Sequence, residues 1–280
     1  MTRYYCLLWM VTLLGSCATK NLPVRSNLTP TDTQGNLTFK YRISYKPDSL
    51  IPETSTEYSN LLVGEQFSRF ETVGGRAQDS VRSLFPDVLT AENFSAQEFA
   101  DKMLAIPRTK FYYTIFKRAT TGRLYCYEKI GNARYTYIET DSTFKWQIGP
   151  EKMTVAGYAC QRATVRFAGR AFEAWFTREI PISEGPYKFH GLPGLIVKIN
   201  DTRQQYVFEL VRAGKTATAD LIVLPTKAAR LVTKTEMRRG LALHNLQFAS
   251  RMASMAAGEK SLSAAERERM LKPLNPLELQ

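Results

Sequence analysis

The sequence predicts a mainly β protein of the α+β class, in which an antiparallel meander of about 9–11 strands curls into a half-barrel with a few packed helices. Three observations support this prediction. Short segments of alternating polarity fill most of the chain from residue 110 to residue 224, turn residues separate them, and helix-capping motifs lie on either side. A sheet with one solvent-exposed face must cover its other, apolar face with helices or curl around a ligand.

The N-terminal end predicts export. Residues 1–17 contain one cation, Arg3, and an apolar run too short to span a bilayer, which is the layout of a secretory signal peptide. The segment that ends at Cys17 fits a bacterial lipobox, in which this cysteine is acylated; the alternative is ordinary cleavage near Ala18. Residues 18–35 are polar and contain prolines, so we expect a flexible tether between a lipid anchor and the folded body.

The β domain is predicted to cover residues 36–230. Its first strand, residues 37–45, alternates apolar and polar residues with a period of two, and residues 61–70 form a second strand. A helical insert near residues 75–106 follows, because a capping box opens at Ser95 and apolar residues then recur at helical spacing.

Further strands are expected after this insert, separated by glycine, proline and asparagine turns. Within one of them, Val165 and Phe167 are expected to face the core while Arg166 faces solvent. The expected segments are residues 111–116, 124–128, 135–139, 144–148, 161–167, 171–177, 195–199, 206–211 and 220–224.

Residues 231–280 are predicted to form a basic helical segment that ends in an extended tail. Capping boxes open at Thr233 and Ser263, each with a glutamate three residues later. A methionine-containing apolar stripe follows the first box. It is either core packing or an adaptable surface for a partner.

Two cysteines, Cys126 and Cys160, remain in the body of the chain. Because an exported chain meets an oxidising compartment, we expect them to form a disulfide, which would stabilise the fold by about 3–4 kcal/mol. The alternative is a redox or metal-binding pair, although the wide spacing lacks the local CxxC form.

A net charge of +12 could suit nucleic acid, but an exported protein rarely meets any. Anionic lipid headgroups or acidic loops of a partner would suit this charge. The alternative is a basic surface that contacts only solvent.

The segment from Gly185 to Ile196 packs three glycines and two prolines into twelve residues and leads into an apolar strand. It is therefore predicted to be a shaped turn that feeds a buried strand, and its glycines either cradle an anion or serve the turn alone. The aromatic residues nearby are either walls of an apolar cleft or core. The candidate binding residues of this turn and cleft are Tyr187, Phe189, His190, Gly191, Leu192, Pro193 and Gly194, with Trp146 and Trp175.

Several motifs resemble those of the GLPGLI family of exported Bacteroidota proteins. Residues 191–196 spell the six signature letters, residues 156–163 resemble the strand entry of the family, and residues 275–279 resemble its chain end. The resemblance implies an exported, predominantly β protein with no settled activity, often associated with outer-membrane TonB-dependent transport. The residues after Cys17 lack an acidic cluster, which favours a lipoprotein on the periplasmic side of the outer membrane over delivery to the cell surface. The expected outline is similar to that of lipoprotein carriers of the LolA type.

Reaction chemistry is not evident in the sequence. His190 and His244 are the only histidines, and a site around His190 with Glu184 and Asp201 requires at least three ligands at defined geometry, for which the sequence contains no metal-site motif. We therefore expect no catalytic residues, no metal and no cofactor. The function predicted is a non-enzymatic envelope protein that binds a protein partner, such as a TonB-dependent system, or an apolar ligand. The alternatives are a metal-dependent hydrolase centred on His190 and a LolA-like lipid carrier.

Overall fold

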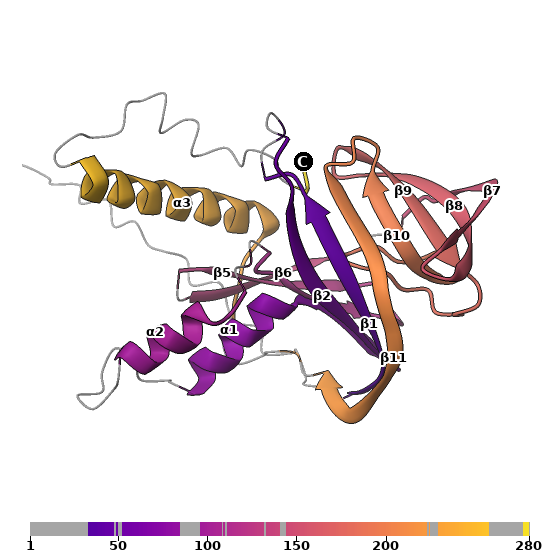
Figure 1. Ribbon diagram of the computed structural model, residues 1–280, viewed down its shortest axis with the longest axis horizontal. Helices are drawn as coiled ribbons and strands as arrows, with labels where there is room; N and C mark the ends of the chain where they lie inside the picture. Colours follow the sequence, from indigo (N-terminus) through magenta and orange to yellow (C-terminus); the bar gives the residue numbers. More distant parts are fainter. Residues whose placement is uncertain are drawn as a thin grey trace, which may run out of the picture.

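One twelve-stranded sheet forms the body of the protein (Figure 1). The computed structural model describes residues 33–47, 49, 52–84, 96–107, 109, 111–131, 133–140, 144–222, 224, 229–257 and 277–279. The strands are β1 (Thr33–Tyr45), β2 (Ser55–Gly64), β3 (Phe67–Thr72), β4 (Thr114–Arg118), β5 (Leu124–Ile130), β6 (Ala133–Glu139), β7 (Gln147–Val155), β8 (Tyr158–Phe167), β9 (Arg170–Thr177), β10 (Leu195–Asp201), β11 (Tyr206–Ile222) and β12 (Ala229–Leu231). The helices are α1 (Val73–Leu84), α2 (Ala96–Leu104) and α3 (Lys234–Ala257).

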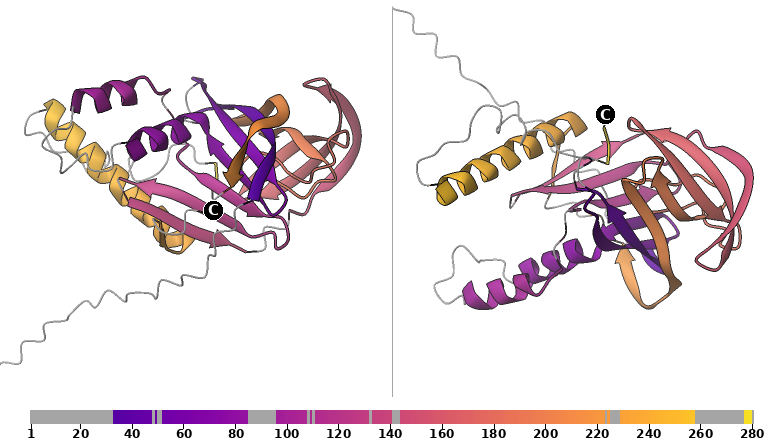
Figure 2. Two further views of the ribbon diagram at one scale, coloured as in Figure 1. Left: turned by 90° about the horizontal axis from the view of Figure 1, so that it is seen from below. Right: turned by 45° about the horizontal axis from the view of Figure 1, so that its top comes forward.

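The strand order is β12-β6-β5-β4-β3-β2-β1-β11-β10-β9-β8-β7, and only the β12–β6 pair is parallel. Strands β2 to β6 with β12 form a first arm, and β7 to β10 form a second arm. The long strands β1 and β11 pair between them. Figure 2 shows the second arm curling away from the helices, so the sheet stays open between its ends. The prediction of a curled, mainly β fold is confirmed.

Tight hairpins build the second arm because the local sequence supplies the required turns. Ala156 and Gly157 between β7 and β8 both have positive φ, as do Ala168 and Gly169 between β8 and β9. Positive φ at both central residues is the geometry of the two-residue hairpin turn that matches strand twist. These turns hold β8 between its neighbours in antiparallel register.

The strand count differs from the expected 9–11 for local reasons. Residues 61–70 belong to two strands, because the chain turns between Gly64 and Phe67. Residues 220–222 extend β11 rather than forming a strand of their own, and β12 is a three-residue addition beside β6. Strand β7 begins at Gln147, later than expected, and runs to Val155.

The core lies on the inner face of the curled sheet. Strand β9 alternates between buried and half-buried positions, as expected for a strand with one face in the core. The main apolar cluster joins Ile43 and Phe70 with Phe172 and Phe176, so a single core holds both arms together. Such burial contributes about 1.5–3 kcal/mol for each large apolar side chain.

The helices extend from the first arm (Figures 1 and 2). Helix α1 contacts β2 and β3, and α3 contacts β5 and β6. The predicted capping box at Thr233 is present, since Glu236 accepts a hydrogen bond from the backbone N–H of Thr233 at 2.8 Å, while the Thr233 hydroxyl accepts one from the N–H of Glu236 at 3.1 Å. None of the described helices is long and apolar enough to cross a membrane.

Several predictions fall outside the described residues. They are the signal peptide of residues 1–17, the acylation of Cys17, the tether as far as residue 32, and the capping residues Ser95 and Ser263. Helices α1 and α2 lie where the helical insert near residues 75–106 was expected.

The predicted disulfide is wrong. Cys126 and Cys160 are free and buried, the first on β5 in the first arm and the second on β8 in the second arm. Burial raises the pKa of the Cys126 thiol to about 12 and that of Cys160 to about 11, so both stay protonated at neutral pH. The thiols therefore act as apolar core groups.

Candidate functional site

The turn before β10, residues 185–194, is buried against the second arm. Gly194 has a φ of 153°, and a Cβ at this position would lie 2.0 Å from the carbonyl oxygen of Thr177 on β9. A Cβ on Gly185 would lie 2.8 Å from the side chain of Ile196. Only glycine fits where the turn approaches β9 and β10 this closely, which explains Gly194 of the signature and Gly185 before it.

The expected contact surface on this turn is not exposed. Tyr187, Phe189 and Leu192 have exposed fractions of 4%, 0% and 1%. Phe189 packs against Phe172 with ring centroids 4.8 Å apart. These side chains are core anchors, because the turn folds inward between the arms, while Gly191 and Pro193 remain exposed.

A buried lysine fastens the turn to the first arm. Lys117 Nζ on β4 donates to the carbonyl oxygens of Gly185 at 2.7 Å and Phe189 at 3.1 Å, and it pairs with Glu184 at 2.6 Å. Burial lowers the pKa of Lys117, although the Glu184 carboxylate acts in the opposite direction. The charge is satisfied within the fold, so Lys117 serves structure.

Trp146 and His190 also fasten this turn. Trp146 Nε1 donates to the carbonyl oxygen of His190 at 2.8 Å, and His190 Nδ1 lies 2.8 Å from the carbonyl oxygen of Lys188. Burial and the nearby Lys117 lower the pKa of His190, which favours the neutral imidazole. Trp175 is on β9 one residue from the buried Phe176, and its Nε1 donates to Glu173 at 3.2 Å. It therefore lies on the other face of the strand.

The geometry does not assemble the hydrolase site considered for His190. Glu184 is paired with Lys117, and it accepts a hydrogen bond from Ser68 at 2.8 Å. Asp201 accepts from Arg170 at 3.3 Å and from the backbone N–H of Tyr206 at 2.7 Å. Among the described residues no three His, Cys, Asp or Glu side chains are grouped as metal ligands would be.

Lys188 lies at the centre of a buried charge network that links the turn to the chain end. Its side chain is 1% exposed, and its Nζ pairs with Glu139 at 3.1 Å and with Glu278 at 2.5 Å. Burial opposes the ammonium charge, but the acidic groups around it, Cys126 and the two glutamates, raise its pKa overall. The lysine is therefore charged at neutral pH.

Glu278 has four donors on its carboxylate. Lys188 and Tyr187 donate to Oε1, each at 2.5 Å, while Lys234 and Arg238 donate to Oε2 at 2.7 and 3.0 Å. Burial by itself would raise the pKa of Glu278, but the charge of Lys188 and these hydrogen bonds outweigh it and lower the pKa to about 2. Glu278 is therefore ionised and fixed.

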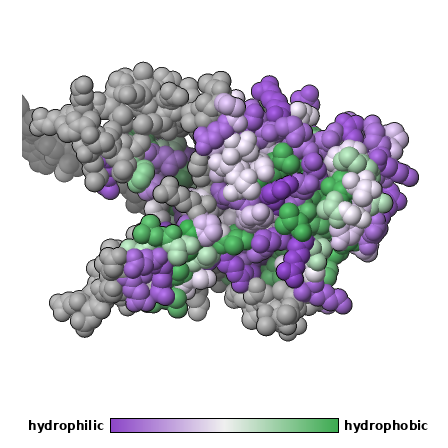
Figure 3. All heavy atoms as spheres, in the orientation of Figure 1, coloured by the Kyte–Doolittle hydropathy of each residue, from purple (hydrophilic) through white to green (hydrophobic). Residues whose placement is uncertain are grey.

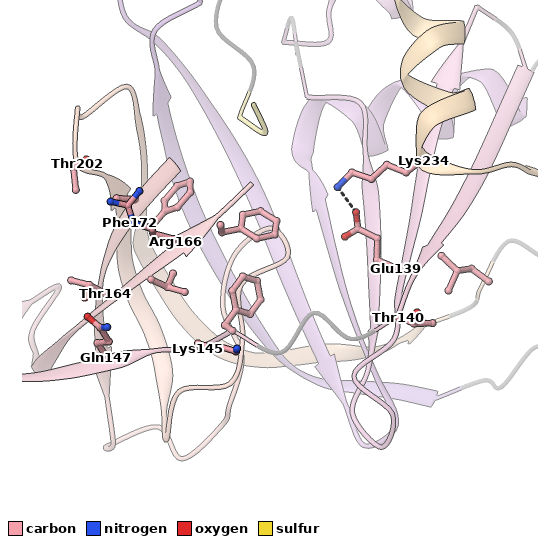
Figure 4. A pocket seen from close by; sticks show the side chains of 14 residues that line it. Glu139, Thr140, Lys145, Gln147, Thr164, Arg166, Phe172, Thr202 and Lys234 are labelled. Carbon is pink, nitrogen blue, oxygen red and sulfur yellow. Dashed lines mark ion pairs between the residues drawn. The ribbon is translucent and has the colours of Figure 1, made fainter. Parts of the chain in front are cut away.

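A cleft of about 970 Å³ opens where the two arms face each other (Figure 4). In Figure 4 Lys145, Gln147 and Arg166 come from the side of the second arm, and Glu139 and Lys234 from the opposite side. The full lining is Ile138, Glu139, Thr140, Phe144, Lys145, Gln147, Thr164, Val165, Arg166, Phe167, Ala171, Phe172, Thr202 and Lys234.

The cleft combines aromatic walls with positive charge. Phe144 and Phe167 pack with ring centroids 5.2 Å apart, and Phe172 lies beside them. Three lining residues are basic and one is acidic. The acid, Glu139, is paired with Lys234 at 2.6 Å, whereas Lys145 and Arg166 are exposed and form no ion pair with any described residue. The cleft therefore combines aromatic and aliphatic surface with two cations that form no ion pair within the described part of the chain.

The sequence analysis located part of this site. It singled out Trp146 and Phe189, which pack behind Phe144 at centroid distances of 5.7 and 5.4 Å. It did not select the lining residues Phe144 and Lys145, although a strand of alternating polarity was expected there. The available signal was the pair of aromatic residues Phe144 and Trp146 on either side of Lys145.

A smaller cavity of about 260 Å³ lies between α3 and the first arm. Met237 and Leu243 of α3 line it with Ile130 and Tyr135. Met237 is 2% exposed, so this end of the methionine-containing stripe is core packing.

Comparisons with known proteins concern the fold and one short segment of the sequence. The structure of PNGF-II in one crystal form matches with a TM-score of 0.52 at 10% identity, covering 77% of this chain and 34% of that chain. A second crystal form of PNGF-II matches with a TM-score of 0.51 at 10% identity, covering 76% and 34%. At this identity the likeness concerns the fold alone, and the chain spans about a third of the length of PNGF-II.

No curated protein matches the chain. A family model does match, over residues 168–198, and its description is "Protein of unknown function (Porph_ging)". The matched segment contains β9, the buried turn and the start of β10. Over this short segment the chain is similar to the GLPGLI family of Bacteroidetes proteins, which confirms the resemblance seen in the sequence.

Proposed function

We propose that the protein is a non-enzymatic, exported binding protein of the cell envelope, whose cleft holds a ligand with an apolar or aromatic part and an anionic group. The observation that carries the proposal is the cleft of about 970 Å³ between the two arms. Sites for small molecules usually have volumes of about 300–1,000 Å³, are mostly apolar and contain few polar groups.

The lining favours an amphiphilic ligand. Phe144, Phe167 and Phe172 offer aromatic surface, which contributes through burial and ring packing. Lys145 and Arg166 are available for an anionic group, because neither charge is used within the described fold. The net charge of +12 would also attract an anion toward the protein.

A probe with both features tests the proposal. 1-Anilinonaphthalene-8-sulfonate combines flat aromatic rings with a fixed negative charge, and its fluorescence reports transfer from water. We expect saturable binding with one probe per protein, weakened by salt because the charges are exposed. Absence of saturable binding would overturn the proposal.

Matched variants locate the binding. Lys145→Glu should weaken probe binding about tenfold, equivalent to about 1.4 kcal/mol, whereas Lys152→Glu should not, since Lys152 is an exposed lysine outside the cleft lining. Phe144→Ala should weaken binding similarly, with Ile148→Ala as its control, because Ile148 is 46% exposed and lies outside the lining. Equal effects of a variant and its control would contradict binding in the cleft.

We also propose a protein partner, in agreement with the expected link to a TonB-dependent outer-membrane system. The helices carry large apolar side chains in solvent: Leu104 of α2 is 80% exposed and Phe248 of α3 is 59% exposed. Figure 3 shows hydrophobic residues along helices α1 and α2. Purification of the protein from native membranes, with mass spectrometry of proteins and lipids, tests both proposals. A stoichiometric transporter would support the partner, and recovery of lipid alone would favour the carrier alternative.

A further inference from the structure

The segment of residues 277–279 lies beside the second arm and helix α3 and contacts both (Figure 1). The segment Leu277–Leu279 is called the strap here. Its Leu277 is 5% exposed and belongs to the main core cluster. A three-residue segment with a buried leucine and a buried carboxylate is held by specific contacts.

One end of the strap is bonded to the second arm. The backbone N–H of Leu279 donates to the carbonyl oxygen of Ala168 at 2.8 Å. Ala168 is in the hairpin turn after Phe167, which lines the cleft. The strap therefore reaches the β8–β9 wall of the cleft.

The other bonds of the strap go to the opposite wall. Glu278 accepts from Lys234 and Arg238 of α3 at 2.7 and 3.0 Å. Lys234 lines the cleft and is also paired with Glu139 of β6, at 2.6 Å. The same carboxylate accepts hydrogen bonds from Lys188 and Tyr187 of the buried turn. The strap thus bonds together the two walls and the buried turn.

We infer that the strap is a latch on the cleft: its contacts hold the two walls at their present separation, and its release lets a ligand enter and leave. This inference rests on the proposed function, because it assigns regulation to the same cleft. The bonds of the strap restrain the separation of the two walls, so entry of a ligand that needs a wider cleft is limited by the release of these bonds.

The carboxylate of Glu278 is the group to perturb. Glu278→Gln keeps the size of the side chain but removes the charge that attracts three cations, so the strap should open more often. Arg238→Gln is a milder variant: its side chain is 44% exposed, so loss of folding is not expected. Arg239→Gln is the matched control, since Arg239 is the exposed neighbour on α3.

The experiment is stopped-flow association of 1-anilinonaphthalene-8-sulfonate with the full chain, with amide hydrogen exchange of the C-terminal peptide measured on the same samples. We expect about tenfold faster association for Glu278→Gln, a smaller increase for Arg238→Gln and none for Arg239→Gln. Exchange of the C-terminal peptide should increase in the same order, and saturating probe should increase it in the unmodified protein.

The two ideas fail in different ways. If the unmodified protein binds the probe and both variants associate at its rate, the latch is wrong and the binding function stands. If a variant exchanges faster at its C-terminal peptide without faster association, the strap opens but does not control entry, and the latch is again wrong. If the unmodified protein shows no saturable binding, the proposed function itself fails, and the latch fails with it.

Discussion

Replacement of Gly194 by alanine should strongly destabilise the protein. The new Cβ would lie 2.0 Å from the Thr177 carbonyl oxygen and 2.7 Å from its carbonyl carbon, both backbone atoms that cannot rotate away. The φ of 153° adds strain of about 1–3 kcal/mol, and overpacking of a buried contact costs about 1–3 kcal/mol. The sum is about 2–6 kcal/mol, a large part of a typical stability of about 5–15 kcal/mol.

Thermal unfolding followed by circular dichroism measures this loss of stability, and substitutions at two other glycines serve as graded controls. Gly157 has a φ of 86° and open space around the Cβ position, so Gly157→Ala should cost about 1 kcal/mol. Gly214 has neither problem, and Gly214→Ala should be close to neutral. A loss of 3 kcal/mol lowers Tm by about 6–12 °C in a domain of this size. If the Gly194→Ala protein has the same Tm as the Gly214→Ala protein, the close-approach argument is refuted.

Three further predictions concern the buried charges and thiols. Lys188→Met should lower the free energy of unfolding in urea by about 3–5 kcal/mol, because Glu139 and Glu278 lose a buried cation. Lys198→Met on β10 is the control and should lower it far less. Equal losses for the two variants would contradict a central role for Lys188. Glu278 has a folded pKa of about 2 against an ordinary 4.5, so the stability that it contributes is complete above about pH 4.5 and is lost as the pH falls toward 2. The stability difference between the unmodified protein and Glu278→Gln should follow that window, and a difference that is constant down to pH 2 would argue against it. Reducing agent should leave Tm unchanged, and Cys126 and Cys160 should react with a thiol reagent only after unfolding; fast reaction of the native protein would contradict their burial.

The fold class could be predicted because strand alternation and turn residues are local signals. The hairpin turns at Gly157 and Gly169 are examples, since positive φ and glycine occur together there. The division of residues 61–70 into two strands was missed because apolar residues continue on both sides of the turn after Gly64. The disulfide prediction failed because a rule about compartment and cysteine number contains no information on which arm each cysteine occupies.

The cleft was harder to predict because its parts are distant in sequence. Glu139 and Lys234 of the lining are separated by 95 positions, and nothing in the sequence around either residue indicates that they pair. The signature turn attracted attention through its glycines, which serve close approach, whereas the lining residues Lys145 and Arg166 lie on ordinary strand-like segments. Sequence periodicity assigns a face to a residue, but the curl of the sheet decides which faces meet.

Among the described strands, β7 pairs with β8 alone, so on its other side another chain could add a strand. The sequence of β7 discourages such addition. Pro150 cannot donate a hydrogen bond, Glu151 and Lys152 place charges along the edge, and the pairing with β8 is irregular between Ile148 and Lys152. The protein can therefore keep its cleft open in the crowded envelope where we propose that it works, because a different part of the same arm prevents edge-to-edge aggregation.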